Sequence, residues 1–396
     1  MKIKIGVIFG GESVEHEISV ISAIQAMKAL DEEKYEIVPI YISKDREWYT
    51  GDLLKDIDLY KDFDNLKKYA KNIVLYNKEG SFVLQSKKGL KKIVNEIDLV
   101  FPIMHGTNGE DGSIQGYLNM LGIPYAESNL YAATIGQDKV FQKQILQSEG
   151  LPVADYTWFF DNEYLEDFNS IKKRVKEIGY PVIVKPSRLG SSIGIKIAKN
   201  EEVLKSAIDE AIRYDDKILI EKMINNLVEL NCAVLGNKEQ VETSLIEEVL
   251  ATDELLSYKD KYIGEKKTKG MLSTNRIIPA DISKKTEKEI YELSKKTFRS
   301  LNFSGIVRID YLMDCKTNKI YINEVNTIPG SLSFYLWDKE NKNYTKLLDE
   351  IINIAIKDYK TKSNKTYSFE INILKNYSGL KGKKGKLKFW FSFFMI

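Results

Sequence analysis

The most constraining feature of this sequence is a stretch of alternating apolar and polar residues around a short polar turn, GIVRIDYLMDCKTNKIYINEVNT (305–327). Alternation with a period of two is typical of a strand that buries one face, and two such strands around a turn predict an antiparallel hairpin. The turn is expected to be centred on Thr317. Val307, Ile309 and Val325 then share one face and are expected to lie in a core.

Four polar residues share the other face of the hairpin: Arg308, Asp310, Glu324 and Asn326. With the turn at its expected centre, the two carboxylates lie opposite each other, and so do the arginine and the asparagine. Opposed carboxylates repel each other, and a divalent cation between them would remove the repulsion. Oxygen ligands without a nearby histidine or cysteine indicate Mg²⁺ or Mn²⁺ rather than zinc. The alternative is a solvated polar face on which Arg308 pairs with Asp310.

A second polar segment, KPSRLGSSIG (185–194), follows a short apolar strand that ends in Lys185. A loop of glycines and serines presents backbone N–H groups and hydroxyls to phosphate oxygens, and the lysine adds a positive charge. The spacing does not match G-x-x-x-x-G-K-[ST], so a P-loop is excluded. The segment is interpreted as a phosphate-binding loop, the alternative being an ordinary turn.

The N-terminal third alternates between strand and helix patterns, which is typical of the α/β class with a parallel sheet covered on both faces. Strands are expected at 3–9, 35–42 and 98–106, and helices at 18–30 and 113–121, with a turn at Gly10-Gly11. Residues 45–92 are charged and weakly patterned and predict no clear element. Further along, we expect a helix at 139–148 and strands at 180–186 and 217–223, the last of which would begin a strand-rich lobe.

At 396 residues the chain is too long for one hydrophobic core. We expect a Rossmann-like lobe at 1–124, two further lobes at 125–216 and 217–360, and a basic, poorly ordered tail at 361–396. That tail holds eight lysines against Glu370, so the preceding residues are net acidic and no nucleic-acid-binding surface is expected. No apolar run is long enough for a membrane span, and no secretory signal is visible. Two cysteines form no disulfide framework, so a cytoplasmic protein is expected.

The phosphate loop and the carboxylate hairpin, about a hundred residues apart, resemble the ATP-grasp fold over roughly residues 139–356. Within that superfamily the chain resembles the D-alanine–D-alanine ligases. The motifs that carry this resemblance are FGGESVEHEIS (9–19), HGTNGEDGSIQG (105–116), KPSRLGSSIG, SYKDKY ending at Tyr262, and NEVNTIPG (323–330). The resemblance implies an N-terminal Rossmann-like lobe followed by a two-lobed ATP-grasp fold. It further implies a D-Ala-D-Ala dipeptide made for peptidoglycan through a D-alanyl phosphate, and a homodimer.

The resemblance also implies roles for individual residues. Glu15 would hold the ammonium of the first D-alanine, Ser191 and Tyr262 would link to it, and Tyr262 would lie on a lid loop that excludes water. His105 would lie near the first substrate's carboxylate. Arg308 and the backbone N–H of Gly330 would stabilise the oxyanion of the tetrahedral intermediate.

The same resemblance assigns the nucleotide and the metal. ATP would be bound by Lys139 and Lys185 at the phosphates, by Glu221, Lys222 and Met223 at the adenine, and by Glu229 at the ribose. This chain is one residue longer than expected between the two glutamates. Mg²⁺ or Mn²⁺, two ions in all, would be held by Asp310, Glu324 and Asn326.

The segment expected to bind the second substrate departs from the family pattern. Tyr335 stands where ligases that use D-alanine twice have a small hydroxyl residue, whereas Leu336 matches. Tyrosine at this position resembles the D-alanine–D-serine ligases of vancomycin resistance, so the second D-amino acid is either D-alanine or D-serine.

Three other classes are less consistent with the sequence. A dinucleotide-binding oxidoreductase would need G-x-G-x-x-G after the first strand, which IFGGESVE lacks. A non-catalytic nucleotide-binding module would not need the complete polar face of the hairpin. Another ATP-grasp ligase, such as a glutathione-type synthetase, would not be expected to have the Glu15, Ser191 and Tyr262 set.

Overall fold

The computed structural model describes residues 2–89, 92–250, 276–338 and 342–368. Two compact units make up the chain, Met1–Tyr359 and Lys360–Ile396. Among the described residues no helix combines the length and the apolar character needed to cross a membrane. The predicted tail lies outside the described residues from residue 369 onward.

The N-terminal lobe is built on a seven-stranded sheet of order β6-β5-β4-β3-β2-β1-β7. Its strands are β1 (Ile3–Gly10), β2 (Tyr35–Ile42), β3 (Trp48–Thr50), β4 (Lys71–Lys78), β5 (Ser81–Ser86), β6 (Ile93–Ile97) and β7 (Leu99–Ile103). Its helices are α1 (His16–Ala29), α2 (Phe63–Tyr69) and α3 (Ser113–Leu121), with short 3₁₀ helices η1 (Asp52–Lys55) and η2 (Ile57–Asp62).

This sheet corrects the expectation of a wholly parallel one. Among the described strands β1 pairs in parallel with β2 and with β7, and β2 through β6 continue the sheet as antiparallel strands. The antiparallel part comes from the weakly patterned stretch 45–92. Its strand β4 buries little more than Ile73 and Leu75 between exposed lysines, so its apolar pattern is too short to be detected.

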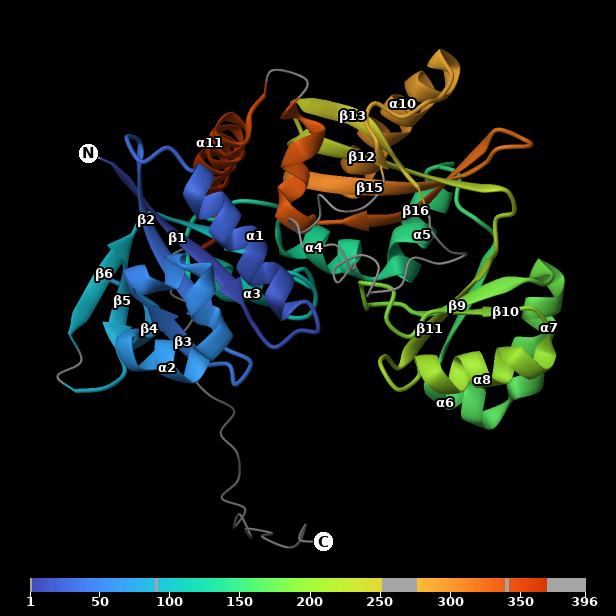
Figure 1. Cartoon of the computed structure of the whole chain (residues 1–396), viewed down its shortest axis with the longest axis horizontal. Helices are drawn as coiled ribbons and strands as arrows, with labels where there is room; N and C mark the ends of the chain where they lie inside the picture. Colours follow the sequence, from blue (N-terminus) through green and yellow to red (C-terminus); the bar gives the residue numbers. More distant parts are fainter. Residues whose placement is uncertain (1, 90–91, 251–275, 339–341, 369–396) are drawn as a thin grey trace, which may run out of the picture. The chain divides into compact units, whose positions relative to one another are not determined.

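The central lobe has a four-stranded sheet of order β10-β9-β11-β8. Its strands are β8 (Tyr156–Phe160), β9 (Val182–Pro186), β10 (Lys196–Ala198) and β11 (Lys217–Lys222). Helices α6 (Asp161–Glu166), α7 (Phe168–Ile178) and α8 (Glu201–Ala211) lie together beside this sheet, and α7 and α8 pack on its strands (Figure 1). We expected the strand at 217–223 to begin the last lobe, but β11 is hydrogen-bonded between β9 and β8, a pairing that no local pattern reveals.

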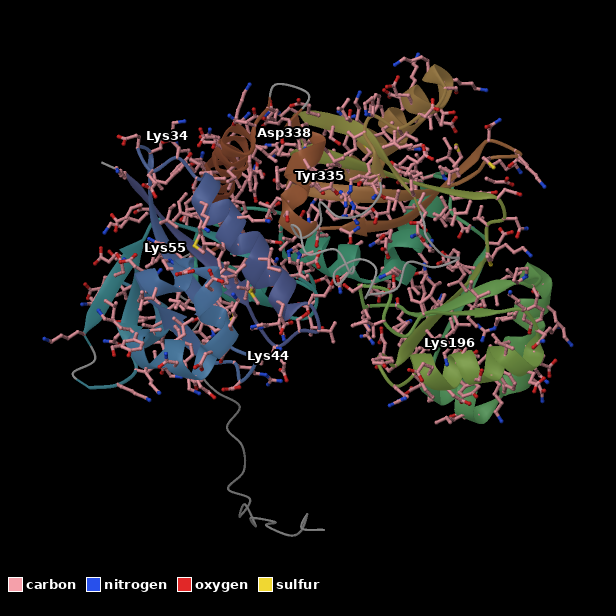
Figure 2. All side chains as sticks on the ribbon, in the orientation of Figure 1. Lys34, Lys44, Lys55, Lys196, Tyr335 and Asp338 are labelled. Atoms are coloured by element: carbon pink, nitrogen blue, oxygen red, sulfur yellow. The ribbon has the colours of Figure 1, made fainter. Side chains whose placement is uncertain are left out.

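The C-terminal lobe has a five-stranded sheet of order β14-β13-β12-β15-β16. Its elements are β12 (Leu227–Gly236), β13 (Val241–Val249), β14 (Arg276–Ile277), α10 (Lys284–Ser300), β15 (Gly305–Asp314), β16 (Lys319–Asn326), η4 (Gly330–Leu336) and α11 (Tyr344–Ser363). Helix α10 packs on β12 and β13. Tyr335, on η4, lies among the packed side chains around this sheet (Figure 2).

Two helices precede β8, namely α4 (Leu130–Gln137) and α5 (Lys139–Ser148). The bounds of α5 are those expected from the sequence. Asp138 caps it, because its side chain accepts hydrogen bonds from the backbone N–H groups of Val140 and Phe141. Lys139, together with Lys143 one turn later, is buried, so α5 presents two lysines on one face.

A buried carboxyl connects the segment before α4 to β15. Glu127 is 6% exposed, and its Oε2 accepts a hydrogen bond from the backbone N–H of Ile306 at 2.8 Å. Its Oε1 is buried and has no hydrogen-bond partner among the described residues. Burial raises the pKa of Glu127 from its ordinary 4.5 to about 8, outweighing the hydrogen bond from Ile306.

We expect Glu127→Gln to remove a pH dependence of stability. Below pH 4.5 the carboxyl is protonated in both states; between 4.5 and 8 it ionises in the unfolded chain first, so wild-type stability falls across this window. At about 1.4 kcal/mol per pKa unit, the shift from 4.5 to about 8 costs the wild type about 4–5 kcal/mol of stability by pH 8, and the variant avoids this loss. A buried amide without a partner costs the variant about 1–3 kcal/mol. Its net gain in stability at pH 8 should therefore be about 2 kcal/mol. Urea midpoints of both proteins from pH 5 to 8 measure this, and parallel curves would contradict it.

Candidate active site

One pocket is lined by side chains from the N-terminal, central and C-terminal lobes. It is lined by eleven of the residues singled out from the sequence: Glu15, Lys139, Lys185, Ser191, Met223, Glu229, Arg308, Asp310, Glu324, Asn326 and Tyr335. Residues that are far apart in the sequence therefore share one cavity. Tyr262 lies outside the described residues.

The hairpin β15–β16 has the register expected at its polar end, with Arg308 opposite Asn326 and Asp310 opposite Glu324. The turn itself is one residue out of step, since Asp314 pairs with Lys319, and an irregularity in β16 restores the register. Asn323 is the extra residue at that irregularity. The bulge is thus what sets the two carboxylates opposite each other.

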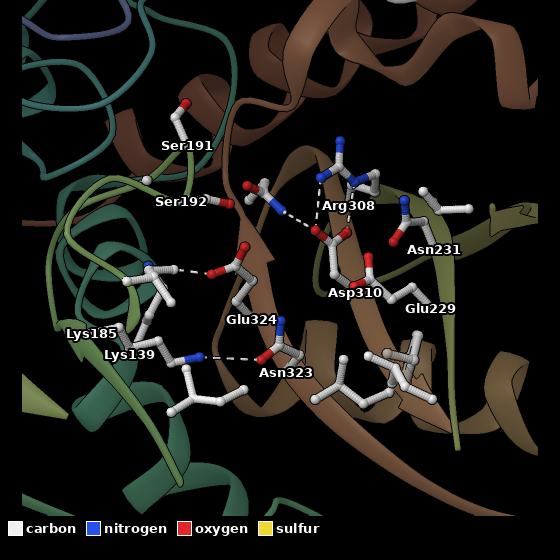
Figure 3. A pocket seen from close by; sticks show the side chains of 18 of the residues that line it. Lys139, Lys185, Ser191, Ser192, Glu229, Asn231, Arg308, Asp310, Asn323 and Glu324 are labelled. Carbon is white, nitrogen blue, oxygen red and sulfur yellow. Dashed lines mark hydrogen bonds and ion pairs between the residues drawn. The ribbon is translucent and has the colours of Figure 1, made fainter. Parts of the chain in front are cut away.

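Arg308 forms a two-pronged ion pair with Asp310 (Figure 3), with Nε–Oδ1 at 2.6 Å and Nη2–Oδ2 at 2.7 Å. Asn326 Nδ2 donates to Asp310 Oδ2 at 3.0 Å. Burial lowers the pKa of Arg308, but Asp310 outweighs it and the pKa is raised, so the guanidinium stays charged. The arginine pairing considered as an alternative is therefore present in this structure.

The donor set of this face still suits a hard divalent cation. Two carboxylates and one amide oxygen lie on one side of the hairpin, and Mg²⁺ is typically held by one or two carboxylates together with substrate phosphates. Within the described ranges no group of three or more His, Cys, Asp or Glu residues is placed to hold a metal. A cation here would therefore need oxygen from Asn326 or from the nucleotide.

Two lysines approach this face from the central lobe (Figure 3). Lys139 Nζ lies 3.3 Å from Glu324 Oε2 and donates to the carbonyl of Leu189 at 2.9 Å. Lys185 Nζ donates to Asn323 Oδ1 at 3.3 Å. Positive charge thus lies between the glycine–serine loop (residues 187–194) and the carboxylates, where it could bind a phosphate chain.

Helix α5 holds the backbone on both sides of Glu324. Lys143 Nζ donates to the carbonyl of Asn323 at 3.2 Å. Gln142 accepts a hydrogen bond from Val325 N at 3.0 Å and donates to Val325 O at 3.3 Å. The bulge that sets the register is therefore fixed by side chains of another element.

A buried ion cluster adjoins the pocket through Lys185, which lines it. Glu221, expected at the adenine, is 4% exposed and pairs with both Lys143 and Lys185. Burial raises the pKa of Glu221, but the two lysines outweigh it and the pKa is lowered. Glu221 is not among the residues that line the pocket, and neither is its neighbour Lys222, which donates to the carbonyls of residues 179 and 180.

Glu15 meets the glycine–serine loop. Ser191 Oγ donates to Glu15 Oε1, which joins the first turn of the N-terminal lobe to the loop after β9. The contact needs glycine on both sides: a Cβ at Gly106 would lie 2.7 Å from Glu15 Oε2, and one at Gly190 would lie 3.0 Å from it. The expected link between Glu15 and Ser191 is thus present as a hydrogen bond.

His105, Gly330 and Leu336 are not among the residues that line the pocket. His105 is 3% exposed, and its Nε2 is 2.9 Å from Ser22 Oγ. Burial lowers the pKa of His105 to about 4, so the ring is neutral at pH 7. Leu336 is part of the apolar core, and Gly330 begins η4.

Several polar residues at the site were not found from the sequence. They are Glu110, Gln142, Lys143, Asn231, Glu247 and Arg276. Glu110 accepts hydrogen bonds from the backbone N–H groups of Gly106, at 2.8 Å, and Ile328, at 3.0 Å, and so joins the loop beside Glu15 to the loop before η4. Its pKa is raised to about 7 by burial and by Glu15. Two of them had a usable signal: Lys143 lies one helical turn after Lys139, and Glu110 lies within the motif at 105–116.

Comparison with known proteins gives a consistent result. Residues 4–128 match the family model described as D-ala D-ala ligase N-terminus, and residues 145–353 match D-ala D-ala ligase C-terminus. A D-alanine--D-alanine ligase from Thermosipho melanesiensis is 42% identical over 373 residues, which cover 94% of this chain and 98% of the relative.

Two solved structures are similar over most of the chain. The D-alanine-D-alanine ligase from Coxiella burnetii has a TM-score of 0.79 and 28% identity, covering 95% of this chain and 98% of its own. The VanG D-Ala:D-Ser ligase from Enterococcus faecalis has a TM-score of 0.76 and 29% identity, covering 90% of this chain and 100% of its own.

Proposed function

The chain belongs to the D-alanine–D-alanine ligase family, and from this premise we propose that its pocket joins two D-alanine molecules through a D-alanyl phosphate formed from ATP. The fold is the expected Rossmann-like lobe followed by a two-lobed ATP-grasp arrangement. The observation that carries the proposal is the convergence in one pocket of Glu15 with Ser191, of two lysines, and of the opposed carboxylates.

In the first step the carboxylate of one D-alanine attacks the γ-phosphorus of ATP, the bond to the bridging oxygen breaks, and ADP leaves. Two anions must approach each other, so the chain has to neutralise their repulsion. Lys139 and Lys185, beside the glycine–serine loop, are the groups we propose for the phosphates. Met223 and Glu229, which line the same pocket, are proposed for the adenine and the ribose. The predicted adenine contacts of Glu221 and Lys222 stay predictions.

Asp310, Glu324 and Asn326 would hold Mg²⁺ or Mn²⁺ on the polar face of the hairpin. When bound, such an ion supplies positive charge to the transferring phosphoryl group and orients it. Lys139, which lies 3.3 Å from Glu324, would bring its own charge to the same place. That two ions bind stays a prediction.

In the second step the amine of the acceptor attacks the acyl-phosphate carbonyl and phosphate leaves. Arg308 and the backbone N–H of Gly330 are proposed to stabilise the oxyanion. Glu15, held by Ser191, would bind the ammonium of the first D-alanine. Neutral His105 would support the first substrate's end of the site, and no protein nucleophile is needed.

D-Serine is the second candidate acceptor, because Tyr335 lines the pocket and the similar VanG protein is described as a D-Ala:D-Ser ligase. A pocket built to hydrogen-bond a hydroxyl rejects an analogue that lacks it, whereas a merely larger pocket does not. We favour D-alanine, since the curated relatives are D-alanine--D-alanine ligases. The homodimer and the cytoplasmic location stay predictions.

We expect purified protein to release phosphate from Mg·ATP with D-alanine alone and to be inactive with L-alanine. The measurement is phosphate release, with the dipeptides identified by mass, for D-alanine alone and for D-alanine with D-serine. Turnover that requires D-serine would replace the proposal by the second candidate. Inactivity with every D-amino acid would contradict both.

A further inference from the structure

The C-terminal sheet carries a third carboxylate in line with the two already described. Glu247 on β13 pairs with Asn231 on β12, Asn231 pairs with Asp310 on β15, and Asp310 pairs with Glu324 on β16. Four polar residues therefore form one row across the sheet. All four line the pocket.

Glu247 differs from the other two carboxylates in its partners. Its Oε1 lies 2.8 Å from Arg276 Nη1, and its Oε2 accepts from Asn231 Nδ2 and from the hydroxyl of Tyr335, each at 3.2 Å. Glu247 is 1% exposed, and the ion pair with Arg276 balances its buried charge.

Arg276 is fixed on a second side as well. Its guanidinium lies over the ring of Tyr335, with Cζ 4.6 Å from the ring centroid. The tyrosine hydroxyl and the arginine thus share Glu247, and the aromatic ring supports the plane of the guanidinium. Tyr335, the residue that departs from the family pattern, is in this way structurally coupled to Arg276.

Four cationic side chains of the described part line the pocket, and three have a proposed task. Lys139 and Lys185 lie at the phosphate loop, and Arg308 is paired with Asp310 at the reacting centre. Arg276 is the fourth, at the end of the row beside Tyr335. The acceptor amino acid must bring its own carboxylate into this pocket together with its amine, and a buried carboxylate requires charged or multiple donors.

From this arrangement we infer that Arg276 binds the carboxylate of the acceptor amino acid, with Glu247 and Tyr335 as the positioning residues that orient its guanidinium. A guanidinium has five N–H donors in a planar fork, so it can hold Glu247 through one edge and a second carboxylate through another. The inference rests on the proposed ligase function and names which residue would select an acceptor with a free carboxylate.

The test is a competition between two acceptors in one reaction. D-Alanine serves as first substrate and as acceptor, while D-alaninamide, which lacks the carboxylate, serves only as acceptor. The two dipeptide products are quantified by mass at fixed concentrations. Wild-type protein should favour D-alanine strongly, and Arg276→Met should reduce the product ratio about tenfold or more, the usual range for a charge-assisted hydrogen bond.

Arg276→Lys keeps the charge without the fork and should give an intermediate ratio. Arg174→Met is the matched control, because Arg174 pairs with Glu163 on the central lobe and does not line the pocket; its ratio should equal that of the wild type. A slower Arg276→Met or Arg276→Lys protein with an unchanged ratio would overturn the inference and leave Arg276 a purely structural role. Wild-type protein that makes neither dipeptide would instead contradict the proposed function itself.

Discussion

Replacing Glu324 with glutamine should reduce kcat by more than about a hundredfold while the protein stays folded. Mutation of residues that only support metal ligands already lowers metal affinity or activity by about 10–100-fold. We propose Glu324 as a direct ligand opposite Asp310, so its replacement should have a larger effect. The glutamine side chain has nearly the same shape, so the hairpin and its bulge should be retained. The loss of charge also removes the ion pair with Lys139.

Two measurements separate this effect from general damage. Steady-state phosphate release gives kcat, and the affinity for Mn²⁺ with a non-hydrolysable ATP analogue reports on the ligands without turnover. Glu289→Gln, the same substitution at an exposed position of α10, is the matched control and should behave as wild type. Near-normal activity and Mn²⁺ affinity of Glu324→Gln would refute the metal assignment.

The part of the site that was predictable from the sequence is the part whose geometry is local. A hairpin fixes which residues oppose each other once its turn is located, and period two fixes which face each occupies. Asp310 and Glu324 could therefore be placed opposite each other without any knowledge of the rest of the fold. Even here the local rule was incomplete, because the turn is displaced and the bulge at Asn323 compensates for it.

The parts that were not predictable depend on pairings between distant segments. Glu247 and Asn231 join the row only because β12 pairs with β13 on one side and with β15 on the other. Similarly, β11 was assigned to the wrong lobe, since its neighbours β9 and β8 come from other parts of the chain. The ion pair of Glu221 depends on a distant segment in the same way, since its partner Lys143 lies on α5, almost eighty residues earlier.

Replacing Lys143 with methionine should reduce stability by about 3–5 kcal/mol, the usual effect of removing one partner from a buried ion pair. Lys143 is 1% exposed, and it holds both Glu221 and the carbonyl of Asn323. Burial is the largest influence on this lysine and lowers its pKa, with Glu221 acting in the opposite direction. Methionine fills a similar volume, so the loss should come from the charge and the hydrogen bond rather than from a cavity.

The decisive measurement is the urea midpoint of three proteins: the wild type, Lys143→Met, and Lys143→Met combined with Glu221→Gln. In the single variant the negative charge of Glu221 is no longer balanced by Lys143. Neutralising Glu221 should then recover part of the lost stability, so the effects of the two substitutions on the free energy of unfolding will not be additive. Lys172→Met, which breaks the partly exposed pair with Glu201, is the control and should cost about 1 kcal/mol or less. A Lys143→Met protein as stable as this control would mean that the buried cluster contributes no net stability. The bulge at Asn323, and with it the position of Glu324, would then have to be maintained by Gln142 and Lys185 alone.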